Sequence, residues 1–178
     1  MDEVEEGKLW SLESKCPRCG SKFTISEYFH NIPLIGKIII SSGRCGNCGY
    51  IYKDVRAAES HGPQRLKVHI DSPNDLNIIV VRAGTASIYI PEFGISITPG
   101  PASHGFITTV EGVLDRIKEV LEMLREDPDI DMEKWRYRMD LIGRAMKGEL
   151  EFTLIIEDPE GVSRIMSEKT EKEEIYKS

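Results

Sequence analysis

The sequence of 178 residues has no apolar run of the roughly 18 residues that a membrane-spanning helix needs. Its first residues, Met1 to Glu6, are mostly acidic, unlike the basic start of a secretory signal. Aromatic residues make up 7% of the chain and the net charge is −7, so the chain as a whole lacks the basic surface typical of a nucleic-acid-binding protein. We therefore expect a soluble cytoplasmic protein with no membrane partner and no overall affinity for nucleic acid.

Patterns typical of enzymes are missing as well. The glycines between residues 94 and 112 fit neither a phosphate-binding loop nor a dinucleotide-binding fingerprint. The histidines His61, His69 and His104 are scattered, without the i, i+2 pairing and the glutamate of a metal-dependent oxygenase site. We therefore predict no catalytic residues, no small-molecule substrate and no enzyme activity.

The chain has only four cysteines, and they form two Cys-x-x-Cys pairs that are each followed by a glycine. The four are Cys16, Cys19, Cys45 and Cys48. Gly20 and Gly49 supply positive φ after each pair and free backbone N–H groups to point at the thiolates, as in a zinc knuckle. Two knuckles provide four sulfurs, which fill the tetrahedral coordination of zinc and leave no position for water. The sequence therefore predicts one structural Zn²⁺ ion.

Three other interpretations of the cysteines carry less weight. Redox dithiols of the thioredoxin kind need a helix after each pair, whereas residues 50–52 have the side chains of a strand. A disulfide framework does not suit a chain that has no signal peptide and is long enough to build its own core. Iron in a rubredoxin-like site uses the same four thiolates, so the sequence alone leaves zinc and iron open in the cell.

Residues 1–56 are predicted to form the zinc-binding unit, a C4 zinc ribbon with an acidic lead. Segment 22–28 alternates apolar and polar residues, and segment 37–42 is rich in β-branched residues. These patterns predict a long hairpin between the two cysteine pairs. Small zinc modules have little core of their own and recruit neighbours, so we expect Trp10 of the lead to pack against this unit.

Residues 64–163 are predicted to form a β-domain, because several alternating segments are separated by clusters of turn residues. These segments are 65–70, 78–81, 86–90, 93–98 and 151–157. A helical hairpin at 109–147 interrupts them, with Thr108 and Glu111 as a capping box for the first helix and Asp131 as the cap of the second. The charged tail at 164–178 is predicted to be a frayed helix or disordered.

Taken together, these motifs resemble the Zpr-one family of C4-type zinc-finger proteins. The resemblance rests on Cys-Pro-x-Cys-Gly at 16–20, on Cys-Gly-Asn-Cys-Gly-Tyr at 45–50 and on Phe-Ile-Thr-Thr-Val-Glu-Gly-Val-Leu at 106–114. It covers roughly residues 10–160. It implies that the ribbon is followed by a double-stranded β-helix, a jelly-roll-like fold, so the expected class is mainly β with an α-helical hairpin.

The same resemblance implies a function. Proteins of this family bind the GTPase elongation factor one-alpha and act in its folding or maturation, so that GTPase is the expected partner here. Eukaryotic members carry the finger and the β-domain twice, and a single copy is similar to the archaeal form. As contacts we expect exposed apolar residues at the finger tip and in one later segment. They are Ile32, Pro33, Leu34, Ile90, Pro91, Glu92 and Phe93.

A nucleic-acid-binding zinc ribbon is the alternative function. Residues 15–56 contain seven Lys and Arg but only Glu27 and Asp54 as acids, so this unit is basic while the rest of the chain is acidic. Basic side chains near the knuckles could contact phosphates, and aromatic ones could stack on bases. These are Arg18, Lys22, Arg44, Tyr28, Phe29, Tyr50 and Tyr52. The competing interpretation of the aromatic residues is that they form the small core of the ribbon.

Overall fold

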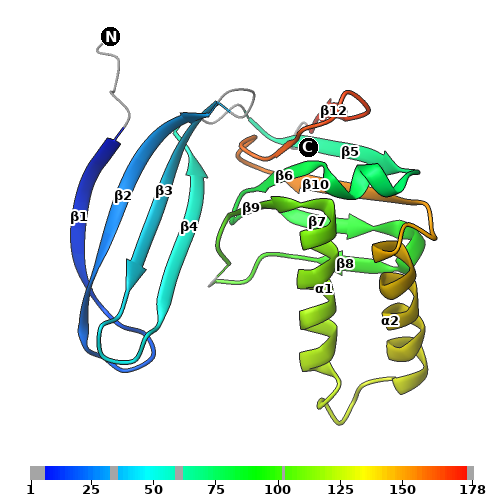
Figure 1. Cartoon of the computed structure of the whole chain (residues 1–178), viewed down its shortest axis with the longest axis horizontal. Coiled ribbons are helices and arrows are strands. Elements are labelled where there is room, and N and C mark those ends of the chain that lie inside the picture. The colour runs from blue at the N-terminus through cyan, green and yellow to red at the C-terminus, as the bar shows by residue number, and fades with distance from the viewer. Residues whose placement is uncertain (1–6, 33–35, 59–61, 102, 176–178) are drawn as a thin grey trace.

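The computed structural model describes residues 7–32, 36–58, 62–101 and 103–175. These residues form two β-rich units, an N-terminal sheet and a larger domain of two sheets and two helices (Figure 1). Within these ranges, no helix is both long and apolar enough to cross a membrane. The predicted class, mainly β with an α-helical hairpin, is confirmed.

The N-terminal unit is a four-stranded antiparallel sheet in the order β1-β2-β3-β4. Its strands are β1 (Gly7–Lys15), β2 (Lys22–Ile32), β3 (Gly36–Arg44) and β4 (Ile51–Ala57). β2 and β3 are the long hairpin that the sequence predicted, and they pair from Ile32 opposite Gly36 to Ile25 opposite Gly43. One cysteine pair lies between β1 and β2 and the other between β3 and β4. The topology therefore brings both pairs to the same end of the sheet (Figure 1).

Trp10 does not pack against the zinc-binding unit as expected. It lies in β1, which pairs with β2 at one edge of the sheet and has a bulge between Lys8 and Trp10. The Trp10 side chain is 46% exposed, and Leu9 and Leu12 are also exposed. The expectation is wrong because main-chain hydrogen bonds to β2, rather than burial of side chains, hold β1 in place. The ribbon therefore has an apolar, exposed edge.

The second unit is built from two antiparallel sheets, one in the order β12-β5-β10-β7-β8 and one in the order β11-β6-β9. Its strands are β5 (Gln64–Ile70), β6 (Ile79–Arg82), β7 (Ser87–Ile90), β8 (Ile95–Ile97), β9 (Phe106–Thr109), β10 (Phe152–Asp158), β11 (Arg164–Ile165) and β12 (Glu171–Glu174), with short 3-10 helices at Pro73–Asn77 and Pro91–Phe93. Burial alternates residue by residue along β5, with Leu66, Val68 and Ile70 inside, as the sequence pattern predicted.

Two helices connect β9 to β10 and lie side by side (Figure 1). They are α1 (Val110–Leu124) and α2 (Met132–Met146). The cap of α1 is Thr109, whose side chain accepts a hydrogen bond from the N–H of Gly112 at 3.2 Å. The predicted cap, Thr108, is wrong by one position, because β9 continues through Thr108 and ends at Thr109, whose side chain then caps the helix. Asp131 caps α2 as predicted, since it accepts two backbone N–H groups of the first turn.

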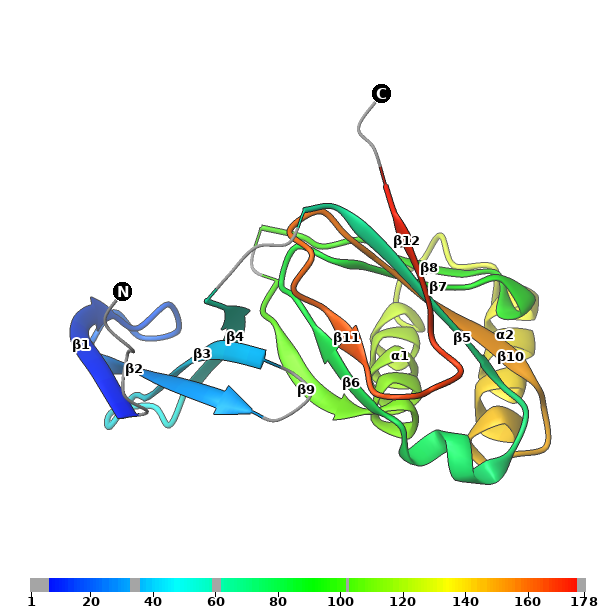
Figure 2. The same ribbon diagram turned by 90° about the horizontal axis from the view of Figure 1, so that it is seen from above.

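The charged tail is a strand at residues 171–174, and the predicted frayed helix or disorder is wrong there. β12 pairs with β5 although its side chains are all exposed (Figure 2). Glu171 lies opposite Lys67 and forms an ion pair with it at 3.1 Å. Glu173 lies opposite Arg65 and is 3.9 Å from it. Opposite charges across the strands make this highly charged segment compatible with a sheet edge.

Candidate metal centre

The four cysteine sulfurs form a tight cluster at the end of the ribbon, all within 4.8 Å of one another. Sγ of Cys16 is 3.6 Å from Sγ of Cys48, and the same distance separates Cys19 from Cys45. A zinc ion with Zn–S bonds of about 2.3 Å places its tetrahedral sulfurs about 3.8 Å apart. The four cysteines are therefore positioned to bind one zinc ion.

Each cysteine pair sits on a tight turn that is closed by the glycine after it. The N–H of Gly20 donates to the carbonyl of Cys16 at 2.8 Å. The N–H of Gly49 donates to the carbonyl of Cys45 at 2.9 Å. Both glycines have positive φ, 72° and 73°, which residues with a Cβ rarely adopt. The two turns thus have the same geometry, and each presents its cysteines to the same point.

The surroundings of the sulfurs favour a bound cation. Hydrogen bonds from the side chains of Asn47 and Ser21 lower the pKa of the Cys19 thiol to about 5, and the thiolate is the form that binds metal. At Cys48 a backbone hydrogen bond from Tyr50 favours the thiolate, but burial and three neighbouring thiols outweigh it and raise the pKa to about 12. Thiolates this close together repel one another unless a cation lies between them, and a bound divalent metal supplies that positive charge.

The aromatic residues near the metal site mostly serve as the core of the ribbon. Phe23 is buried beside the cysteines, and Tyr50 contacts it edge-on with ring centroids 6.2 Å apart. Tyr52 packs against the same cluster, and Phe29 is buried further along β2. Of the aromatic side chains that could stack on nucleic acid, Phe29 is therefore inaccessible, and Tyr50 and Tyr52 are partly covered.

Two of the expected partner contacts are in the wrong place for that role. Ile90 and Phe93 are buried in the core of the second unit, with 0% and 4% of their surface exposed. They were expected to be exposed apolar contacts, but a 3-10 turn directs the two apolar side chains inward. Pro91 and Glu92 are exposed. Ile32 ends β2, and Pro33 and Leu34 lie outside the described residues.

A contact between the two units was not predicted. The N–H of Gly105, just before β9, donates to Oδ1 of Asp54 in β4 at 2.8 Å. The ring of Tyr52 meets His104 edge-on at 5.0 Å. One signal was available in the sequence, because Asp54 is one of only two acids in residues 15–56. Its acceptor role depends on tertiary structure and could not be read from spacing.

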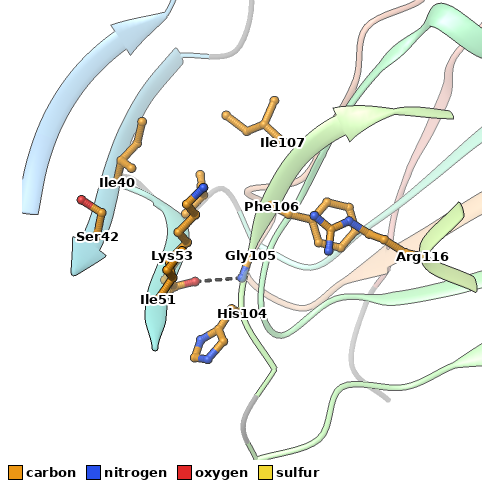
Figure 3. A pocket seen from close by; sticks show the side chains of 11 residues that line it. Ile40, Ser42, Ile51, Lys53, His104, Gly105, Phe106, Ile107 and Arg116 are labelled. Atoms are coloured by element: carbon orange, nitrogen blue, oxygen red, sulfur yellow. Dashed lines mark hydrogen bonds between the residues drawn. The ribbon is translucent and has the colours of Figure 1, made fainter. Parts of the chain in front are cut away.

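A cleft of about 670 Å³ lies beside this contact, with residues of both units in its walls (Figure 3). Ile40, Ile51 and Lys53 come from the ribbon. Phe106 and Arg116 come from the second unit, where the Arg116 guanidinium lies 4.5 Å from the centre of the Phe106 ring. The cleft contains no cysteine and is separate from the metal centre.

Fold and site together define a class of protein, a C4 zinc ribbon joined to a jelly-roll-like domain with an inserted helical hairpin. Two family models match the chain, the ZPR1 zinc-finger domain over residues 8–63 and the ZPR1 jelly-roll domain over residues 74–177. The chain belongs to the ZPR1 family. The predicted family, jelly-roll fold and zinc ligand set are confirmed.

Relatives from archaea match nearly the whole chain. A ZPR1-like protein of Pyrococcus horikoshii is 36% identical over 99% of this chain and 82% of its own length. A ZPR1-like protein of Methanocaldococcus jannaschii is also 36% identical, over 89% of this chain and 82% of its own. The zinc finger chaperone zpr1 of Schizosaccharomyces pombe is 27% identical over 88% of this chain but only 36% of its own length. The chain thus corresponds to a part of the eukaryotic protein and to most of the archaeal ones.

Proposed function

We propose that this protein is a non-enzymatic, chaperone-like binding protein of the cytoplasm that binds the GTPase elongation factor one-alpha and assists its folding or maturation. The observation that carries the proposal is the match of both family domains, in order, along almost the entire chain. The fission-yeast relative bears the name of a zinc finger chaperone, which supports the same class of activity.

The metal centre supports binding rather than catalysis. Four sulfurs complete a tetrahedron, and a zinc ion held in this way has no position for water or substrate. A closed site of this kind stabilises the turns around it. The ribbon then acts as a rigid element that presents its strands and its hairpin to a partner.

The edge of the ribbon offers a surface for such a partner. Leu9, Trp10 and Leu12 are exposed on β1, whose outer edge has no neighbouring strand among the described residues. Exposed apolar groups next to free main-chain donors and acceptors suit binding to an extended or incompletely folded segment. We add these residues to the contacts proposed from the sequence, namely the finger tip at 32–34 and the exposed Pro91 and Glu92.

A pull-down from lysate of the source cell tests the proposal. Zinc-loaded protein is the bait, and the beads are washed at about 50 and then about 200 mM salt, with and without nuclease, because nucleic-acid binding weakens steeply over this range. We expect the elongation factor to be retained under all four conditions. Recovery only of RNA-linked proteins that disappear with nuclease or salt would contradict the proposal and favour a nucleic-acid-binding ribbon.

A matched pair of variants tests the edge. Trp10→Ser removes an aromatic side chain on β1, and Tyr137→Ser removes one on α2 that is 63% exposed. We expect Trp10→Ser to reduce the recovered elongation factor several-fold and Tyr137→Ser to leave it unchanged. Equal recovery with both variants would place the contact elsewhere on the protein.

A further inference from the structure

We propose that a groove along α1, which starts at the junction of the two units, binds an acidic segment of a partner protein that also carries apolar side chains. We call it the α1 groove. It is made of three adjoining clefts of about 670, 300 and 260 Å³. The first and second clefts share His104, Phe106 and Arg116 as lining residues. The second and third share Ile97, Ile117 and Val120. One surface therefore runs from the ribbon to α2.

The apolar part of the groove is exposed at both ends. Ile51 of β4 and Ile107 of β9 are exposed at the junction, where they line the cleft of Figure 3. Val120 and Leu124 of α1 are exposed at the far end, each 41%. Branched aliphatic side chains gathered along one groove indicate a surface that gains free energy when apolar groups cover it.

The charged part of the groove is basic, although the whole protein carries a net charge of −7. Lys53, Arg116 and Arg138 line it, and none of the three forms an ion pair within the described ranges. The only carboxylate among the lining residues is Asp54, which already accepts the N–H of Gly105 at 2.8 Å. Basic groups without a carboxylate partner around an apolar floor favour an acidic, apolar ligand over a neutral or basic one.

Arg82 adds a further positive charge beneath the middle cleft. It is buried, 4% exposed, and lines that cleft. The acceptors of its hydrogen bonds are uncharged: the carbonyls of Ala86 and His104 and the hydroxyl of Ser103. These bonds hold the guanidinium in place. The charge of the buried Asp158 partly offsets that of Arg82, and the neighbouring Arg116 adds a positive charge in the same cleft.

Nucleic acid fits this groove less well than an acidic peptide does. About half of the residues that line the three clefts are aliphatic, and Phe106 is the one aromatic ring besides His104 among them. The guanidinium of Arg116 already lies 4.5 Å from the centre of the Phe106 ring, where a base would stack. Figure 3 shows the two side chains together at the edge of the first cleft.

Fluorescence anisotropy with labelled peptides tests the inference directly, using the zinc-loaded full chain. The probe is a synthetic peptide of Glu, Leu and Ser residues. Two reference peptides replace all Glu by Lys or all Leu by Ser. We expect the Glu/Leu peptide to bind at least about tenfold more tightly than either reference, because both charge and apolar contact contribute.

Charge-reversal variants locate the peptide on the protein. Arg116→Glu with Arg138→Glu changes the groove, whereas Arg136→Glu with Lys172→Glu makes the same change in net charge at exposed residues outside its lining. We expect the first pair to weaken binding of the Glu/Leu peptide at least about tenfold and the second pair to change it by less than about twofold. Circular dichroism of both pairs checks that each is folded.

Three results would overturn the inference. The first is equal binding of the Glu and Lys peptides, and the second is equal weakening of binding by both variant pairs. The third is that an oligouridylate binds more tightly than the Glu/Leu peptide and that the groove variant loses this oligouridylate binding. The peptide titration needs no elongation factor, so its outcome is separate from the proposed function. Titrating the same variants with the elongation factor then shows whether that protein uses the groove.

Discussion

The N–H of Gly105 donates to the carboxylate of Asp54 at 2.8 Å, and this hydrogen bond joins the jelly-roll-like domain to the zinc ribbon. The backbones are so close that a Cβ on Gly105 would lie 1.9 Å from the carbonyl oxygen of Val55. A glycine is therefore required at this position. The ribbon and the domain touch through the backbone itself as well as being connected by the linker.

Gly105→Ala is expected to break this contact. Because the added methyl group meets backbone rather than a flexible side chain, we expect a loss of stability of about 1–3 kcal/mol. Limited proteolysis of the segment between β4 and β5 should also become faster. Gly100→Ala is the matched control, since a Cβ there would meet no atom within 4 Å. Equal unfolding curves for Gly105→Ala and the native protein would contradict the close approach.

Removal of the metal is expected to unfold the ribbon and leave the jelly-roll-like domain folded. The ribbon has only a small core beside the cysteines, whereas the domain has its own extensive core. Chelation, or Cys16→Ser with Cys45→Ser, should therefore remove protection from hydrogen exchange in residues 7–57 but not in 64–158. Added zinc should restore the chelated native protein and not the variant. Loss of protection throughout the chain would contradict the proposed boundary between residues 56 and 64.

The first turn of α1 should show coupling between Gly112 and Thr108. A Cβ on Gly112 would lie 2.0 Å from Oγ1 of Thr108. We expect Gly112→Ala to cost about 1–3 kcal/mol in the native background. In the background of Thr108→Ala the cost should fall to near zero, because the contact with Oγ1 is removed and the remaining 3.3 Å approach to the Cβ of residue 108 is offset by the preference of a helix for Ala over Gly, about 1 kcal/mol. Urea unfolding of all four proteins measures this, and an equal cost in both backgrounds would exclude the clash.

The stability of the second unit should depend on the ionisation of Asp75. Burial opposes its ionisation, but hydrogen bonds from Lys169 at 2.9 Å and from the N–H groups of Asp71 and Ser72 prevail and lower its pKa to about 2. A carboxylate with a lowered pKa stabilises the folded state above the unfolded pKa of about 4. That stabilisation, of about 2 kcal/mol, is lost as the pH falls from about 4 to about 2.

Urea unfolding between pH 7 and pH 2 measures this contribution. Asp75→Asn should be less stable than the native protein at pH 7 and should lose less stability between pH 4 and pH 2. Asp129→Asn is the control, because Asp129 is an exposed acid in the loop between the helices. Identical pH dependence for Asp75→Asn and the native protein would contradict the assignment.

Local patterns in the sequence predicted much of the fold and the metal site. The Cys-x-x-Cys-Gly pairs carry both the ligands and the glycines that their turns need, so the site is almost fully specified by residues close in sequence. Asp131 likewise caps a helix through its own neighbours. Alternation predicted β5 because one face of that strand is buried along its whole length.

The features that the sequence did not reveal depend on residues outside the segments themselves. β1 has no buried face and is a strand only because β2 pairs with it. β12 is four charged residues whose pairing requires the basic face of β5. Ile90 and Phe93 were predicted to contact a partner, yet the turn between them directs both into the core. The partner of β12 lies far away in the chain and that of β1 is the next strand, and in neither case does the propensity or spacing of the segment itself indicate the pairing.

Refolding of purified elongation factor one-alpha tests the proposed chaperone-like role most directly. The denatured GTPase is diluted into buffer with the zinc-loaded protein, with the variant Cys16→Ser and Cys45→Ser, or with neither, and recovered GDP binding is measured over time. We expect the zinc-loaded protein to raise the yield or the rate of recovery in proportion to its concentration, and the variant to have no effect. Recovery that is the same in all three samples would contradict a role in the folding of this GTPase.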